Sequence, residues 1–260
     1  MTDRPLSDRP MHGVLAALGK RVLRPGGRAL TRRLLEALAI GPADDVVEFA
    51  PGAGATARRA LAYEPNSYTG IELDREAARA LRDDLGGPGR EIVVGNAADT
   101  DLADGAADVV YGEAMLSMQP DAGKAAIVRE ANRLLEPGGV YGIHELELVP
   151  DGLDAETKAT VRDDLTQAAK VRARPLTESE WVSLLETEGF TVRWRATAPM
   201  RLLEPRRVLR SEGAIRTLRI AGTLLARPDL RDRVRSMRRA FGKHGRRLNA
   251  VALVAEKTEA

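Results

Sequence analysis

The chain has 260 residues, of which 43% are hydrophobic and 30% are charged, so a packed core is expected and general disorder is excluded. It contains no cysteine, which excludes disulfide bonds, thiolate metal sites and cysteine nucleophiles. Because residues 1–5 have no apolar run and no window reaches membrane-spanning length, the sequence predicts a soluble, cytoplasmic protein.

The net charge of +2 is unevenly distributed along the chain. Residues 201–247 hold 15 of the 40 basic residues but only 4 of the 38 acidic residues, so this basic segment is near +11 and the remainder near −9. Such asymmetry is typical of a segment that binds an anionic partner, and also of a solvated helical surface on an arginine-rich protein.

Two helices are predicted before the first strand. Residues 11–20 and 29–40 have apolar side chains at helical spacing, and a Pro-Gly-Gly turn at 25–27 separates them. We therefore expect an N-terminal helical cap at residues 1–41. The apolar face of the second helix should consist of Leu30, Leu34, Leu35 and Leu38.

Residues 46–54, Val-Val-Glu-Phe-Ala-Pro-Gly-Ala-Gly, predict a buried strand that ends in a glycine turn, and a helix follows at 55–64. Strand, glycine turn and helix form the nucleotide-binding unit of doubly wound α/β folds, where a ligand approaches the main chain and the helix N-terminus offers free N–H groups. The spacing of Gly52, Gly54 and Ala57 also fits the dinucleotide fingerprint, which leaves an NAD-dependent oxidoreductase as one interpretation.

The acid inside this strand, Glu48, favours a different cofactor. The stretch from Glu48 to Gly54 resembles motif I of the class I S-adenosylmethionine (SAM) methyltransferases, an acid followed by Gly-x-Gly-x-Gly, with Ala50 in place of the first glycine. The resemblance implies that SAM binds against Glu48, Ala50, Pro51, Gly52 and Gly54.

The second predicted strand, at 67–74, ends in acids and precedes a helix at 75–85. Glu72 lies 24 positions after Glu48, where an acid can accept hydrogen bonds from both ribose hydroxyls. The family places its ribose acid here too, so Glu72 with its neighbour Leu73 is the predicted ribose site, and Asp74 is the alternative acid.

A third strand at 91–94 ends in Gly-Asn-Ala, where the family often has Gly-Asp-Ala. The resemblance implies that Asn96 accepts a hydrogen bond from the adenine amino group, through an uncharged amide oxygen. It also implies that the backbone N–H of Ala97 meets a ring nitrogen.

A fourth strand at 107–111, a helix at 122–135 and a fifth strand at 140–144 follow, and Leu-Glu-Pro-Gly-Gly at 135–139 closely matches the family's Leu-x-Pro-Gly-Gly turn. The resemblance covers roughly residues 42–200 and is nearest to the methyltransferases of ubiquinone and menaquinone biosynthesis, which act on many small molecules. It implies a doubly wound, seven-stranded, mostly parallel α/β sheet. It also implies a small-molecule acceptor and S-adenosylhomocysteine as product.

The C-terminal part departs from the usual pattern of this fold. Helices at 153–173 and 178–188, the second opened by a capping box, precede a strand at 190–197, and the last strand is predicted at 250–255. These two strands usually form a tight hairpin, but about fifty residues separate them here, so we predict a helical lid near the carboxyl ends of the strands. The predicted units are the core at 42–200, the lid at 201–248, and the last strand and tail at 249–260. Apolar residues at helical spacing in the lid include Leu218, Ile220, Leu224 and Leu225.

Methyl transfer from SAM is an in-line displacement in which the enzyme aligns donor and acceptor and excludes water, so no metal is required. An acceptor hydroxyl, carbon acid or protonated amine also needs a group that takes its proton. Glu113, His144 and Tyr111, at the ends of the fourth and fifth strands, are the candidate catalytic residues, beside Met115 and Met118. Glu113 could instead bind the SAM amino group, and His144 could be a buried imidazole bonded to the main chain.

Several alternatives remain open from the sequence. The basic segment allows an anionic acceptor and keeps a nucleic-acid methyltransferase as an alternative, although an aromatic content of 3% leaves few stacking platforms and makes nucleic acid a disfavoured partner. A SAM-binding protein without catalysis is another alternative. Weak candidates for substrate contacts in the N-terminal cap are Lys20, Arg21 and Arg24.

Overall fold

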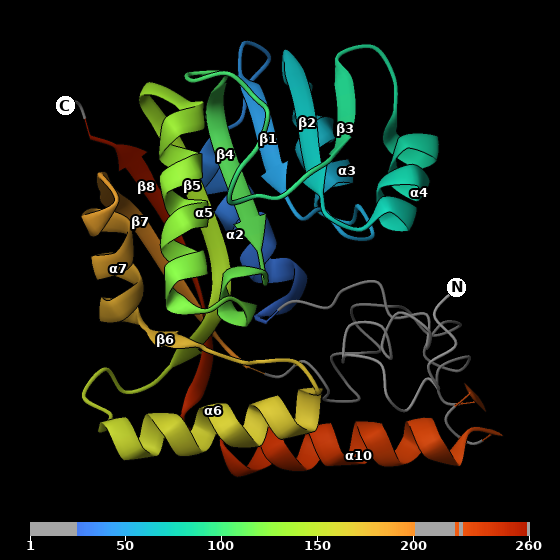
Figure 1. Cartoon of the computed structure of the whole chain (residues 1–260), viewed down its shortest axis with the longest axis vertical. Coiled ribbons are helices and arrows are strands. Elements are labelled where there is room, and N and C mark those ends of the chain that lie inside the picture. Colours follow the sequence, from blue (N-terminus) through green and yellow to red (C-terminus); the bar gives the residue numbers. More distant parts are fainter. Residues whose placement is uncertain (1–24, 201–221, 224–225, 259–260) are drawn as a thin grey trace.

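The computed structural model describes residues 25–200, 222–223 and 226–258 (Figure 1). The strands are β1 (Asp45–Phe49), β2 (Ser67–Glu72), β3 (Arg90–Val94), β4 (Ala107–Glu113), β5 (Leu135–Leu148), β6 (Leu176–Thr177), β7 (Phe190–Pro199) and β8 (Leu248–Lys257). The helices are α2 (Gly27–Leu38), α3 (Ala57–Ala60), α4 (Arg75–Leu85), α5 (Asp121–Leu134), α6 (Ala155–Ala169), α7 (Glu178–Thr187) and α10 (Pro228–Lys243), with 3-10 turns η2 (Leu61–Tyr63) and η3 (Leu116–Met118).

The strands form one sheet in the order β3-β2-β1-β4-β5-β8-β7, and the two-residue strand β6 pairs with the end of β5 off this path. Strands β1 to β5 run parallel, whereas β8 runs antiparallel to both β5 and β7. The predicted seven-stranded, mostly parallel, doubly wound sheet is therefore confirmed, and the carboxyl ends of its parallel strands share one edge.

Helices cover both faces of the sheet. Side chains of α2, α3 and α4 pack on one face, and those of α5 and α7 pack on the other. The predicted apolar face of α2 is confirmed, since its four leucines are buried. Glycine at position 142 of β5 lets α2 pack closely on the sheet, because a Cβ atom there would lie 2.9 Å from Leu38 Cδ2 and would require Leu38 to shift.

A third apolar cluster lies at the carboxyl edge, where α6 and α10 run side by side (Figure 1). It joins Val161 and Leu165 of α6 to Leu148 at the end of β5 and Leu248 at the start of β8. Helix α10 belongs to the long connection between the last two strands, so this part of the connection lies where the predicted lid should be. Two sets of predicted residues lie outside the described part of the chain. They are the apolar lid residues Leu218, Ile220, Leu224 and Leu225 and the cap residues Lys20, Arg21 and Arg24.

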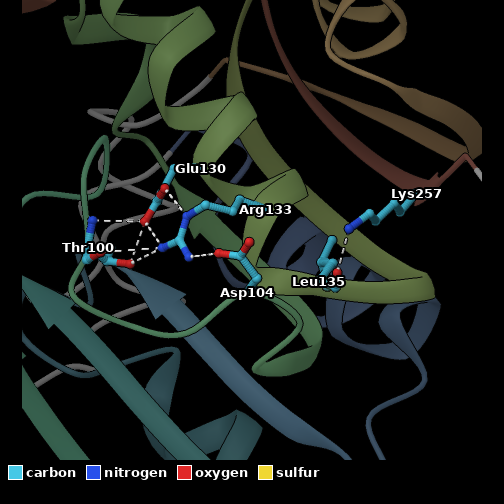
Figure 2. Close-up of polar contacts among 6 residues, drawn as sticks. All are labelled: Thr100, Asp104, Glu130, Arg133, Leu135 and Lys257. Carbon is cyan, nitrogen blue, oxygen red and sulfur yellow. Dashed lines mark hydrogen bonds and ion pairs between the residues drawn. The ribbon is translucent and has the colours of Figure 1, made fainter. Parts of the chain in front are cut away.

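Strand β5 differs most from its predicted bounds, because it begins at Leu135 rather than at Val140. Leu135 pairs with Ala107, and the register shifts before Val140 pairs with Val109. The predicted Pro-Gly-Gly turn is thus an irregular part of the strand, in which Gly138 has a φ of +79°. Lys257 Nζ also donates to the Leu135 carbonyl (2.7 Å), which ties the end of β8 to the start of β5 (Figure 2).

A polar network holds the loop after β3 against α5 (Figure 2). Glu130 accepts from the Thr100 backbone N–H (2.8 Å) and from Arg133 Nη2 (2.7 Å), and Arg133 also pairs with Asp104. Burial opposes ionisation of Glu130, but the hydrogen bonds from Arg133 and Thr100 outweigh it and lower the pKa to about 2. The network therefore fixes the loop that follows Asn96 through a carboxylate that is charged at neutral pH.

Glu147 of β5 is a buried carboxyl group that we expect to make stability pH-dependent. Burial and the negative charges of Glu178 and Asp151 raise its pKa to about 7, against a smaller opposing hydrogen bond from Asn249. From about pH 4.5 to pH 7 the folded chain keeps a proton that the unfolded chain has lost, so the free energy of unfolding falls as pH rises through this window. The Glu147→Gln variant should lack this fall.

The difference is measurable by urea denaturation at pH 5 and pH 8. Between pH 5 and pH 8, the free energy of unfolding of Glu147→Gln should rise by about 1–2 kcal/mol relative to that of wild type. This difference is smaller than the energy equivalent of the full pKa shift, because water screens the neighbouring charges. Glu136→Gln, an exposed change in the same strand, is the control and should leave the pH dependence unaltered. Identical pH profiles for wild type and Glu147→Gln would contradict the assignment.

Candidate active site

The two glycines of the turn after β1 have different roles. Gly52 has a φ of +57°, and a Cβ atom added there would have only the Ala50 carbonyl oxygen within 4 Å, at 3.9 Å. Gly54 has a φ of +68°, and its added Cβ would lie 2.9 Å from Leu81 Cδ2 of α4. Gly52 thus borders open space where a ligand can approach the main chain, whereas Gly54 lets the turn pack against α4.

Glu72 lies directly across from this open space. Its Oε2 accepts from the Gly52 backbone N–H (3.0 Å) and its Oε1 from the Asp74 backbone N–H (3.1 Å). The Asp74 carboxylate instead caps α4 by accepting from the Ala77 backbone N–H (2.8 Å). The structure therefore places Glu72, rather than Asp74, beside the glycine turn.

An apolar side chain is exposed next to Glu72. Leu73 is 73% exposed, and Val94, which pairs with Glu72 at the end of β3, is 37% exposed. Solvent-exposed large apolar side chains at a strand edge can contact an aromatic ring of a ligand. These two positions fit the adenosine part of the predicted cofactor.

The loop after β3 presents Asn96 and Ala97. Asn96 is exposed, and its Oδ1 accepts from the Ala98 backbone N–H (3.1 Å), while Ala97 is buried. The predicted adenine acceptor is thus bonded within its own loop, and a carbonyl oxygen has a second lone pair for a further donor.

The motif I acid Glu48 is nearly covered by protein and lies among tyrosines. Its Oε2 accepts from Tyr68 Oη (2.6 Å) and Tyr111 Oη (2.7 Å), so one carboxylate joins β1 to both neighbouring strands. Burial, then the Glu48 charge, raises the pKa of both tyrosine hydroxyls well above the usual value. Tyr111 is fully buried, its hydroxyl donates to Glu48, and the Glu113 charge contributes to its raised pKa.

Glu113 is the last residue of β4 and lies beside His144, which is inside β5 because that strand continues to Leu148 rather than ending at residue 144 as predicted. Glu113 Oε1 is 2.6 Å from His144 Nδ1 and accepts from Thr31 Oγ1 (2.7 Å), and Glu113 Oε2 accepts from Thr56 Oγ1. His144 pairs in register with Glu113, and its carbonyl accepts from the Ala114 backbone N–H (2.7 Å). Four elements, α2, the glycine turn, β4 and β5, thus converge on one carboxylate.

Both threonines were missed by the sequence reasoning. Thr31 is fully buried on α2, and Thr56 is 2% exposed just before α3. A usable signal existed for Thr31, because it falls at helical spacing from Leu34, Leu35 and Leu38 and so puts a hydroxyl on the apolar face.

Glu145 follows His144 in sequence but faces the opposite side of the sheet. Its carboxylate is fully buried and accepts from the backbone N–H groups of Met115 (2.9 Å), Leu116 (2.7 Å) and Ser117 (3.1 Å), and from Ser117 Oγ (2.7 Å). Burial raises the pKa of Glu145, while these hydrogen bonds lower it. Glu145 therefore fixes the loop after β4 and does not join Glu113 and His144.

Two alanines at the carboxyl edge adopt the left-handed conformation that favours glycine. Ala50 after β1 has a φ of +53°, and Ala114 after β4 has a φ of +55°. The Ala50 angle explains why the family has glycine at this position of motif I. Such strained residues cost of order 1–3 kcal/mol and cluster at functional sites.

The described part of the chain has neither a cluster of metal-ligating side chains nor a helix that could span a membrane. Within residues 25–200, 222–223 and 226–258, no group of three histidine, aspartate or glutamate side chains could hold a metal ion. Within the same ranges, no helix is both long and apolar enough to cross a bilayer.

Comparison with known proteins finds similarity over the part of the chain that carries this site. The methyltransferase domain family matches residues 47–143, which run from β1 into β5. An uncharacterised protein of Haemophilus influenzae is 28% identical over 254 residues, which cover 96% of this chain and 99% of that protein.

Among solved structures, the (4+2)-cyclase SpnF superposes with a TM-score of 0.72 at 16% identity, covering 96% of this chain and 94% of that one. Phosphoethanolamine N-methyltransferase 2 of Haemonchus contortus, in complex with S-adenosyl-L-methionine, superposes with a TM-score of 0.70 at 15% identity, covering 95% of this chain and 57% of that one. At such identities these structures show the fold alone. The methyltransferase domain match over residues 47–143 supplies the activity on that fold, so the chain is a SAM-dependent methyltransferase.

Proposed function

We propose that this enzyme transfers the SAM methyl group to a small-molecule acceptor bound at the carboxyl edge of β4 and β5. SAM supplies an electrophilic methyl group when it is bound. The chain's own residues would orient it and exclude water. Those that would hold SAM are Glu48, Ala50, Pro51, Gly52, Gly54, Glu72, Leu73, Asn96 and Ala97, whereas Glu113 is bonded to His144, Thr31 and Thr56 and would act on the acceptor side.

The observation that carries this proposal is the contact between Glu72 and Gly52. A buried carboxylate faces a glycine that borders open space, and the exposed Leu73 lies next to it. The carboxylate can exchange its Gly52 hydrogen bond for two ribose hydroxyls, and the glycine lets the cofactor approach the main chain. Glu48 would act from beneath the turn, since it is buried and bonded to two tyrosines.

The acceptor would lie on the side of Glu113 and His144, under a lid that includes α10. Support comes from the position of α6 and α10 at the carboxyl edge and from the buried Leu230 and Met237 on the inner side of α10. The charge of the basic segment would draw an anionic acceptor toward this edge, at a rate that falls with salt. The resemblance to quinone-biosynthesis methyltransferases stays a prediction.

Loss of the ribose acid tests the site directly. We expect Glu72→Ala to weaken SAM binding roughly ten- to hundredfold, because charge-assisted hydrogen bonds of about 1.5–3 kcal/mol are lost. Isothermal titration calorimetry with SAM, and with NADH as the rival ligand, measures the effect.

Asp74→Ala is the matched control for this change. It removes the cap of α4, which costs about 1 kcal/mol of stability, but should leave the SAM affinity within about twofold of wild type. A large loss of affinity in Asp74→Ala with little loss in Glu72→Ala would show that the wrong acid has been assigned. Tighter binding of NADH than of SAM would contradict the proposed function.

A further inference from the structure

His144 has one ring nitrogen occupied and the other unpaired. Its side chain is fully buried, Nδ1 lies 2.6 Å from Glu113 Oε1, and Nε2 has no hydrogen-bond partner among the described residues. Buried polar atoms in native proteins are almost always hydrogen-bonded, so an orphaned nitrogen beside an active site calls for a partner in the working state.

The neighbours of Glu113 determine which kind of partner is missing. Thr31 and Thr56 donate to its two oxygens, so the carboxylate is fixed from α2 and from the glycine turn. Because both Glu113 oxygens already accept hydrogen bonds from threonine hydroxyls, we assign Glu113 as the acceptor toward His144, which puts the His144 proton on Nδ1 and the lone pair on Nε2. The unpaired nitrogen is therefore a hydrogen-bond acceptor, and its missing partner is a donor.

We propose that His144 Nε2 takes the proton of the acceptor atom that receives the methyl group, with Glu113, Thr31 and Thr56 as positioning residues. This inference rests on the proposed methyl transfer and narrows its substrate class to acceptors with a proton on the reacting atom, such as a hydroxyl or an acidic carbon. The acceptor atom forms its bond to the methyl carbon as the carbon–sulfur bond breaks with its electron pair going to sulfur. The acceptor's proton passes to Nε2, and the Glu113 charge compensates the imidazolium.

The tautomer of His144 is a readout that needs no acceptor. Protein labelled with ¹⁵N at histidine and bound to S-adenosylhomocysteine should show the neutral Nδ1–H tautomer for His144 at pH 8. The signal is assigned by its absence in His144→Gln, since the chain has two other histidines, His12 and His244. A neutral Nε2–H tautomer would overturn the proposal, because that nitrogen would then have no lone pair for a proton.

Methyl transfer supplies the second readout. The probe is trideuteromethyl-SAM with the small-molecule fraction of an extract of the cells that produce the protein, and labelled products are quantified by mass spectrometry. We expect His144→Gln to lose at least about a hundredfold in initial rate, the usual contribution of a general base, while its SAM affinity stays unchanged.

The positioning role is tested with two variants of Thr31. Thr31→Val keeps the shape of the side chain but removes its hydroxyl, whereas Thr31→Ser keeps the hydroxyl. Thr31→Val should lose about tenfold in rate and lose the single Nδ1–H tautomer, whereas Thr31→Ser should restore both. An equal loss in the valine and serine variants would show that Thr31 acts through packing, and would overturn its positioning role.

The outcomes separate this inference from the function on which it rests. Equal rates for wild type and His144→Gln would overturn the His144 assignment and leave methyl transfer intact. A wild-type enzyme that does not bind SAM would contradict the proposed function itself. If His144→Gln does not fold, the His12→Gln and His244→Gln variants assign the His144 signal by elimination, so the tautomer and the Thr31 pair still decide the matter.

Discussion

The Gly52→Val variant is expected to bind SAM at least about a hundredfold more weakly than the wild type while remaining folded. The added side chain would project from the main chain into the open space beside Glu72, and overpacking of a close approach costs about 1–3 kcal/mol or more. A β-branched residue at a φ of +57° adds backbone strain that also disturbs the turn. Calorimetry with SAM measures the loss, and circular dichroism verifies the fold.

Gly138→Val is the matched control for this experiment. Gly138 has a φ of +79° with no atom within 4 Å of an added Cβ, so it takes on comparable backbone strain in an equally open position. It lies at the amino end of β5, away from the carboxyl edge. We expect this control to lose stability and to keep its SAM affinity. Unchanged SAM affinity in a folded Gly52→Val protein would contradict the cofactor site.

Glu145→Ala is expected to be the most destabilising single change in the site, lowering the free energy of unfolding by about 3–5 kcal/mol. The change leaves three buried backbone N–H groups and the Ser117 hydroxyl without their acceptor. Urea denaturation measures the loss, and Glu136→Ala, exposed in the same strand, should cost less than about 0.5 kcal/mol.

A conservative variant separates the hydrogen bonds of Glu145 from its packing. Glu145→Gln keeps the length of the side chain and one acceptor oxygen, so we expect it to fall between wild type and Glu145→Ala. If Glu145→Ala cost no more than Glu136→Ala, the four hydrogen bonds would not fix the loop after β4.

Much of the fold is local information and could be predicted from the sequence. The spacing of apolar residues predicted the buried face of α2 and the positions of the strands. It could do so because the period of the apolar side chains shows which face of a helix or strand is covered. The capping box at Thr177 and Glu180 is present as predicted, since it depends only on residues within one helical turn. The strand at Leu135 was not predictable in this way, because its pairing with β4 depends on a register shift between distant segments.

For the proposed cofactor side, the sequence by itself determined that Glu72 belongs with the glycine turn, because the turn and the acid at the end of the next strand occur at fixed distances along the chain. For the acceptor side, only the tertiary structure decided the partners. His144 and Glu145 are neighbours in sequence, yet consecutive residues of a strand face opposite sides of the sheet. One therefore meets Glu113 under α2 and the other fixes the loop after β4. No local pattern shows whether His144 or Glu145 is the partner of Glu113, because the choice depends on the register of β5 against β4 and on the packing of Thr31 above them.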